Sequence, residues 1–139
     1  KKLKKKEKFF NKVCRNFPQK FQFGNKKIFL TLLLSNNKKI KVLNKKFRNK
    51  NKPTDVLSFP FEQKIRNSKK IYLGDIIISF NFLNKPKNLS IYEFKKKTIK
   101  IFIHGYLHLL GYDHMKHIDY KKMVKEEEKV FKFVKKILN

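Results

Sequence analysis

Three of the four histidines in this 139-residue chain lie between positions 104 and 114, in the spacing His-x3-His-x2-Gly-x2-His. His104 and His108 are four residues apart, so on a helix they share one face. Gly111 allows the chain to leave that helix and turn back, which can aim His114 at the same point. Three imidazoles with one coordination position left free are typical of a catalytic metal site, most naturally zinc. We expect His117 at the surface or at a helix cap.

The residue after His104 separates this segment from a familiar class of zinc enzyme. The spacing resembles that of the metzincin proteases, but those enzymes carry a glutamate there as the general base for peptide hydrolysis. Gly105 offers no base, and phosphodiester cleavage depends more on a cation that neutralises phosphate oxygens. Because a glycine within a helix costs about 1 kcal/mol relative to alanine, Gly105 indicates either a packing constraint or a need for space at the metal face.

Other side chains could support such a site. Arg48 is one of 3 arginines in a chain with 34 lysines, and its planar guanidinium can bind phosphate in a bidentate manner. Asp113 is expected to be a turn residue or a partner of a ligand imidazole. Asp75, inside a strand pattern, is expected to make a structural hydrogen bond and to support a histidine behind it. Ser58 has no nearby base, so a serine nucleophile is not supported.

The composition limits the class of protein. A formal net charge of +27 attracts polyanions and repels cations, which favours a nucleic-acid partner. Part of this charge reflects codon usage, because 34 Lys and 13 Asn with no Ala are typical of an AT-rich genome. Hydrophobic residues make up 40% of the chain, enough for one core in a single domain over residues 1–139.

Neither a membrane protein nor a secreted protein is expected. No apolar run approaches the ~18 residues of a membrane span. The basic start is not followed by the apolar segment of a signal peptide. Cys14 is the single cysteine, which excludes an internal disulfide and fits a reducing, cytoplasmic compartment. We expect it to be a small buried apolar residue.

The first half of the chain predicts two helices and a strand. Residues 1–17 carry apolar side chains at roughly helical spacing and predict an amphipathic helix. The continuous apolar run 28–34 predicts a buried strand. Asn36-Asn37 offers a cap for a second helix with an apolar face at Ile40, Leu43 and Phe47, which Asn51 and Pro53 end.

The second half predicts two strands and the helix that carries the histidines. Residues 55–61 and 71–80 predict strands, the first near an edge or an end because of Pro60, with a polar loop over 63–70 between them. Ser90 and Glu93 form a capping box for a helix to Leu110, with Gly111 just beyond its end. A last helix is expected over 119–138, with Met123, Phe131, Val134 and Leu138 on its core face. This pattern predicts an α+β fold, a small mixed β-sheet flanked by helices.

Three blocks of sequence together resemble a known family. They are His-Gly-x-Leu-His-Leu-x-Gly-Tyr-Asp-His over 104–114, Leu-Asn through Arg48 to Thr-Asp-Val-Leu-Ser-Phe-Pro over 43–60, and Leu-Gly-Asp-Ile-x-Ile-Ser over 73–79. In this order they resemble the YbeY family of bacterial metal-dependent endoribonucleases, across about residues 28–138. The strand that this family carries before its first helix is short or absent here.

The resemblance implies a small sheet flanked by helices and a single-strand-specific RNase. It implies action in ribosomal RNA maturation, notably at the 3′ end of the small-subunit RNA, and in ribosome quality control. It implies one Zn²⁺ held by His104, His108 and His114, and a functional arginine at Arg48. Single-stranded RNA, ribosomal RNA and the small ribosomal subunit are then the partners, with no membrane and no DNA.

The leading hypothesis is therefore a cytoplasmic zinc-dependent endoribonuclease, in which Arg48 binds the scissile or a flanking phosphate. The attacking group is either a water activated by the ion or the 2′-OH of the RNA. Two alternatives remain. One is a non-catalytic ribosome-assembly factor whose metal is structural, with His117 or Cys14 as fourth ligand. The other is a metzincin-like peptidase, with Asp113 as the nearby acidic base.

Overall fold

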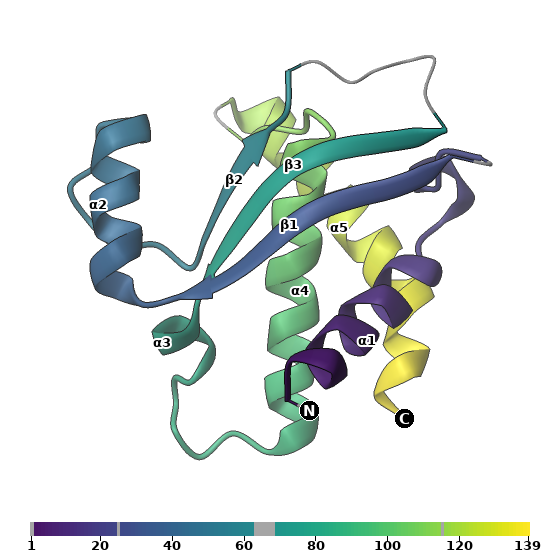
Figure 1. The fold of residues 1–139 in the computed structure, drawn as a ribbon, viewed down its shortest axis with the longest axis horizontal. Helices are drawn as coiled ribbons and strands as arrows, with labels where there is room; N and C mark the ends of the chain where they lie inside the picture. Colours follow the sequence, from purple (N-terminus) through teal and green to yellow (C-terminus); the bar gives the residue numbers. More distant parts are fainter. Residues whose placement is uncertain (1, 25, 63–68, 115) are drawn as a thin grey trace.

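The structure is a computed structural model that describes residues 2–24, 26–62, 69–114 and 116–139 (Figure 1). Within them the chain forms helices on both sides of one mixed sheet, which confirms the predicted α+β class. The elements are α1 (Lys2–Arg15), η1 (Gln19–Phe21), β1 (Lys27–Ser35), α2 (Asn37–Arg48), β2 (Val56–Pro60), β3 (Lys70–Ser79), α3 (Phe80–Leu83), α4 (Ile91–Leu109), α5 (His117–Val134) and η2 (Lys135–Leu138).

The sheet has the strand order β1-β3-β2, with β1 parallel and β2 antiparallel to β3. The predicted position of Pro60 is confirmed, because it ends β2 at one edge of the sheet. β3 is the central strand, as its isoleucine-rich sequence requires, and Ile76 and Ile78 are fully buried. Within β3, Gly74 has a φ of +137° and lies so close to β2 that a Cβ there would clash with the Phe59 carbonyl oxygen.

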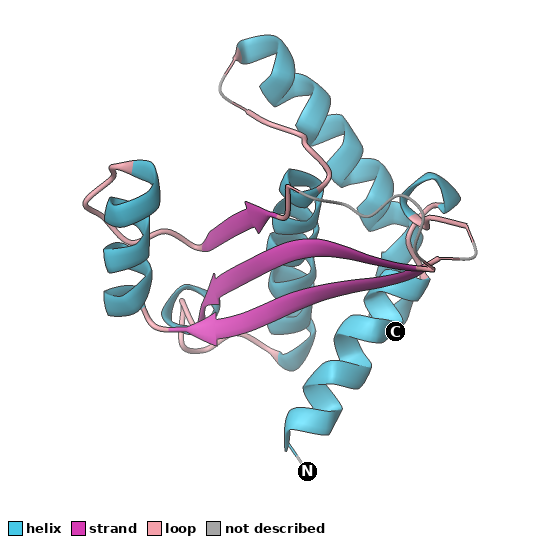
Figure 2. Ribbon diagram, turned by 45° about the horizontal axis from the view of Figure 1, so that its top comes forward, coloured by secondary structure: helices cyan, strands magenta, loops and turns pink. Residues whose placement is uncertain are grey.

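The main hydrophobic core lies between one face of this sheet and α4. α4 crosses behind the sheet, and α1 and α5 lie beside it on the same side (Figures 1 and 2). The apolar side chains of α4 are buried against this face of the sheet and against α1 and α5; they include Ile99, Phe102, Ile103 and Leu107. α2 packs on the opposite face through a smaller cluster of Ile40, Leu57 and Ile77. Each buried aliphatic or aromatic side chain contributes about 1.5–3 kcal/mol, so α4 is the most firmly anchored helix.

The predicted helix caps are present. The Asn36 side chain accepts a hydrogen bond from the backbone of Lys39 at 2.9 Å. Ser90 and Glu93 exchange both bonds of the capping box. Since each cap satisfies a backbone N–H that the helix itself cannot, both start positions are well determined.

Several sequence predictions were wrong in detail. β1 is not buried: it is an edge strand with alternating exposure, and Phe29 and Leu33 are 45% and 50% exposed. Phe47 is 58% exposed rather than part of the core. The last helix begins two residues earlier than expected, at His117, and its final turn is a 3-10 helix, η2. Its core face includes the buried Val130. The short helix α3 was not predicted. Positions 63–68 of the predicted polar loop lie outside the described residues.

Two other features bear on the surface of the molecule. A groove of about 760 Å³ runs between α1 and β1, lined mostly by apolar side chains. None of the helices in the described ranges combines the length and apolar character needed to cross a membrane.

Candidate metal centre

The end of α4 positions the first two histidines. His104 and His108 lie one turn apart on the same face of this helix, as their spacing predicts. Leu110 caps the helix, and the backbone N–H groups of Gly111 and Tyr112 donate to the carbonyls of His108 and Leu107 at 3.0 and 3.1 Å. Gly111 adopts a φ of +97°, which an L-residue rarely takes. This reversal is what returns the chain toward the face that carries the histidines.

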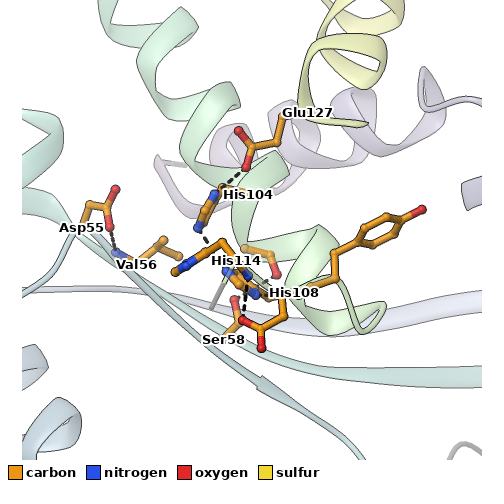
Figure 3. Close-up of polar contacts among 10 residues, drawn as sticks. Asp55, Val56, Ser58, His104, His108, His114 and Glu127 are labelled. Carbon is orange, nitrogen blue, oxygen red and sulfur yellow. Dashed lines mark hydrogen bonds and ion pairs between the residues drawn. The ribbon is translucent and has the colours of Figure 1, made fainter. Parts of the chain in front are cut away.

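The three predicted ligands meet at one point (Figure 3). The ring centroids of His104 and His108 are 4.7 Å apart, and that of His114 lies 5.4 and 4.9 Å from them. One ring nitrogen from each residue falls within 4.8 Å of the other two. All three side chains are half-buried. Cys14 and His117 are not members of this group among the described residues.

The hydrogen bonds behind the rings fix which nitrogen carries the proton. His104 Nδ1 lies 2.6 Å from a Glu127 carboxylate oxygen, and His108 Nδ1 lies 2.8 Å from the Tyr112 carbonyl oxygen. Both oxygens can only accept, so in each ring Nδ1 is the donor. The neutral imidazoles therefore present unprotonated Nε2 atoms to each other.

These two Nε2 atoms lie 3.1 Å apart. Two lone pairs at this distance repel each other unless a cation or an extra proton lies between them. In a tetrahedral zinc site with Zn–N distances of about 2.0–2.1 Å, neighbouring ligand nitrogens are about 3.3 Å apart. The donor set, the tautomers and the spacing of these residues thus fit a divalent metal ion.

The electrostatics of the site favour the form that binds metal. Burial lowers the pKa of His108, and the neighbouring His104 lowers it further. A metal ligand must be the neutral imidazole, so a lowered pKa keeps His108 available for binding at neutral pH.

Of the two explanations for Gly105, the structure supports a packing constraint. A Cβ at this position would lie 3.0 Å from Ile76 Cγ2 and 3.1 Å from both Ser58 Oγ and Val56 Cγ2. The absence of a side chain therefore lets α4 approach the sheet closely. Ser58 reinforces this contact, because its hydroxyl donates to the Gly105 carbonyl at 2.9 Å. The two residues hold the first ligand against β2.

The two carboxylates predicted near the site, Asp113 and Asp75, both make local hydrogen bonds. Asp113 accepts a 2.7 Å hydrogen bond from the backbone N–H of His114, so it shapes the turn. Asp75 makes the structural hydrogen bond that was expected, but from the hydroxyl of Tyr72, on the other face of the sheet. No hydrogen bond joins Asp75 to a histidine within the described parts of the chain.

Two further predicted residues can be placed. Cys14 is partly buried against the core, and burial raises the pKa of its thiol to about 12, which agrees with an apolar role. Arg48 is the last residue of α2 and is exposed. Its neighbour Phe47 packs on Phe59 of β2 at 5.2 Å between ring centroids. This places Arg48 beside the edge strand, whereas the histidines lie on the opposite face of the sheet.

Glu127 is the site residue that sequence reasoning missed. It lies on α5, 23 positions beyond His104, within the acidic run 126–128. By itself, an acidic run ahead of lysines in a helix indicates only that it complements the helix dipole. Its periodicity relative to Met123 and Val130 places position 127 beside the core face, which is the one signal that could have drawn attention to it.

The fold and the cluster together define a class, a small α+β protein with a three-histidine metal-binding geometry at the end of its core helix. Comparison with known proteins then identifies the family. The family model described as Endoribonuclease YbeY matches residues 1–135. The chain belongs to this family.

Two relatives from other bacteria carry the name of this family. A protein of Pelagibacter ubique named Endoribonuclease YbeY is 64% identical over 135 residues, which are 97% of this chain and 88% of the relative. One from Persephonella marina with the same name is 36% identical over 78% of this chain and 69% of its own length. A solution structure of a Thermotoga maritima protein is 27% identical and covers 91% of this chain and 81% of its own, with a TM-score of 0.45.

Proposed function

We propose that this protein is a zinc-dependent, single-strand-specific endoribonuclease that acts in the cytoplasm on ribosomal RNA. We further propose that it matures the 3′ end of the small-subunit RNA and takes part in ribosome quality control. Membership of a family whose members are named endoribonucleases supports the activity. The net charge of +27 supports a polyanionic substrate.

The observation that carries the proposal is the convergence of the His104 and His108 Nε2 lone pairs at 3.1 Å. Both Nδ1 protons already have acceptors, so this arrangement is favourable only around a positive charge. His104, His108 and His114 would hold one Zn²⁺. A zinc ion held by these residues would supply a Lewis acid for phosphate oxygens and would lower the pKa of nearby water.

The chain's own residues would then position the ion and the substrate. Glu127 and the Tyr112 carbonyl keep the Nδ1 protons in place and the rings oriented. The Arg48 side chain makes no hydrogen bond or ion pair with any described residue, so its guanidinium is available for a phosphate. Because Arg48 and the histidines flank the edge strand β2, an RNA that contacts both must pass over this edge.

A cleavage assay on single-stranded RNA tests the proposal. We expect the wild type to cleave, to lose activity in chelator and to regain it with added Zn²⁺. His108→Ala should abolish cleavage, whereas His117→Ala should retain it. Arg48→Ala should weaken substrate binding, whereas Arg15→Ala, which removes the same charge from an exposed position on α1, should not.

The products distinguish the attacking group. A 2′,3′-cyclic phosphate indicates attack by the 2′-OH, and a linear phosphate indicates attack by water. A precursor of small-subunit RNA with an extended 3′ end tests the specific substrate. Full activity of His108→Ala, or full activity in chelator, would overturn the proposal and favour a binding role.

A further inference from the structure

The face of the sheet away from α4 carries three aromatic side chains in a row. Phe29 of β1 and Tyr72 of β3 are register partners on neighbouring strands. Phe61 continues the β2 ladder, because its backbone N–H donates to the Leu73 carbonyl at 2.9 Å. Its ring meets that of Tyr72 edge to face, with centroids 5.5 Å apart. We call Phe29, Tyr72 and Phe61 the aromatic row.

The row is open to solvent and its middle ring is fixed. Phe29 and Phe61 are each 45% exposed, and α2 covers the same face only farther along, around Ile77. The Tyr72 hydroxyl lies 2.6 Å from Thr31 Oγ1 and donates to Asp75. These bonds hold the ring in one orientation, so little conformational freedom remains to be lost when a ligand packs on it.

Cations border this face. Lys70 Nζ lies 5.9 Å from the centroid of Phe29. At the other end, Lys46 Nζ lies 5.3 Å from the centroid of Phe47, the residue before Arg48. Asp75 also lies on this face, with its carboxylate bonded to Tyr72. Exposed rings bordered by lysines on a chain of net charge +27 suit an anionic ligand that has flat apolar groups.

We propose that the aromatic row is a stacking platform for unpaired bases of single-stranded RNA, outside the metal centre. This inference rests on the proposed function and adds a second contact surface for the same substrate. Single-stranded nucleic acids bind proteins through aromatic rings that stack on bases and cations that follow the phosphates. Both components are present on this one face.

The edge strand connects the platform to the metal centre. Along β2, Ser58 points toward α4 and bonds the Gly105 carbonyl, next to the first histidine. The next residue, Phe59, points to the opposite face, where it packs on Phe47. A strand of RNA that leaves the histidines over β2 therefore passes Phe59 and reaches the face that carries the aromatic row. A protein that docked on the aromatic row would not require the row to be connected to the metal centre in this way.

A tryptophan reporter tests the stacking directly, because the chain contains no tryptophan. In Phe61→Trp, we expect fluorescence quenching when an oligoadenylate of about twelve nucleotides is added in chelator, so that no cleavage occurs. Phe133→Trp, at a 55% exposed position on α5, is the control and should not be quenched. Oligonucleotide binding, seen by anisotropy, without quenching in Phe61→Trp would overturn the proposal.

Affinity measurements complete the test. Phe29→Ala and Phe61→Ala should each weaken binding of this oligonucleotide by roughly fivefold or more, and Phe133→Ala should not. Phe61→Leu keeps the apolar bulk but removes the ring, so it should weaken binding as Phe61→Ala does. Wild-type affinity in Phe29→Ala and Phe61→Ala would reject the stacking platform. The aromatic row would then be better explained as a binding surface for a protein.

These readouts separate the two proposals. Binding in chelator does not depend on cleavage, so an inactive wild type would overturn the proposed activity while the platform could still be measured. Conversely, metal-dependent cleavage with unchanged affinity in the row variants would reject the platform alone. Thermal melting of every variant establishes that each substitution leaves the fold intact.

Discussion

The contact between Glu127 and His104 yields a quantitative prediction for metal binding. The two groups are 2.6 Å apart and each side chain is 29% exposed, so solvent screens the pair only in part. A hydrogen bond to a charged group contributes about 1.5–3 kcal/mol, and we take the lower end because of this exposure. Glu127→Gln should therefore weaken zinc binding by at most about tenfold, since about 1.4 kcal/mol corresponds to a factor of ten.

The choice of side chain separates charge from orientation. In Glu127→Gln the amide oxygen can still accept the Nδ1 proton, so the tautomer of His104 is kept and only the negative charge is lost. Glu127→Ala removes the acceptor altogether and frees the ring to rotate. Its loss of affinity should approach the upper end of the roughly 10- to 100-fold range known for residues that orient metal ligands.

Competition with a chromophoric chelator, on protein first stripped of metal, measures these affinities. Glu128→Gln is the matched control, because it removes the same charge from the exposed neighbouring position on α5. We expect wild-type affinity for this control. If Glu127→Gln and Glu128→Gln weaken zinc binding equally, the effect is one of net charge. Wild-type affinity in Glu127→Ala would refute the proposed orientation of His104 by Glu127.

Three further predictions concern stability. Burial places the pKa of His108 below its usual 6.5. As the pH falls below 6.5, His108 therefore takes up a proton in the unfolded chain before it does so in the folded chain. The metal-free protein should lose stability in this pH range. His108→Gln should reduce this slope in urea denaturation, and His117→Gln should not; equal slopes would contradict the assignment. Glu126→Gln should lower the free energy of unfolding at pH 7 by about 1 kcal/mol, because Glu126 accepts a 2.6 Å hydrogen bond from the half-exposed Lys20. Since this bond lowers the pKa of Glu126, its contribution to the free energy of unfolding should decrease as the pH falls through 4.5 and below. An unchanged free energy of unfolding in Glu126→Gln at pH 7 would show that the pair does not stabilise the fold. Gly74→Ala should cost about 3 kcal/mol and lower the melting temperature by about 10 °C, because of its positive φ and the adjoining β2 backbone; an unchanged melting temperature would exclude that strain.

The sequence predicted the helix that carries the histidines and their convergence, because both follow from local rules. The capping box sets the start of α4, the four-residue spacing sets a common face, and Gly111 permits the reversal. These local signals lie within residues 90–114 and need no knowledge of tertiary contacts. Family resemblance, over a much longer part of the chain, added the expected substrate.

Features that depend on distant neighbours could not be predicted in this way. The apolar run of β1 resembles a buried strand, but only the strand order shows that it lies at an edge with one exposed face. Asp75 could be seen to need a partner. The β1–β3 register shifts between the Phe29–Tyr72 and Thr31–Asp75 pairs, so that Tyr72 and Asp75 face the same side and Tyr72 becomes the partner. Glu127 reaches His104 only because α5 packs along α4.

Placing Glu127 on the last long helix has a consequence for synthesis of the chain. A nascent polypeptide that ends at His114 already contains all three imidazoles, but it lacks the carboxylate that orients His104 and the Glu126 that bonds Lys20. Correct geometry at the metal therefore awaits translation of α5.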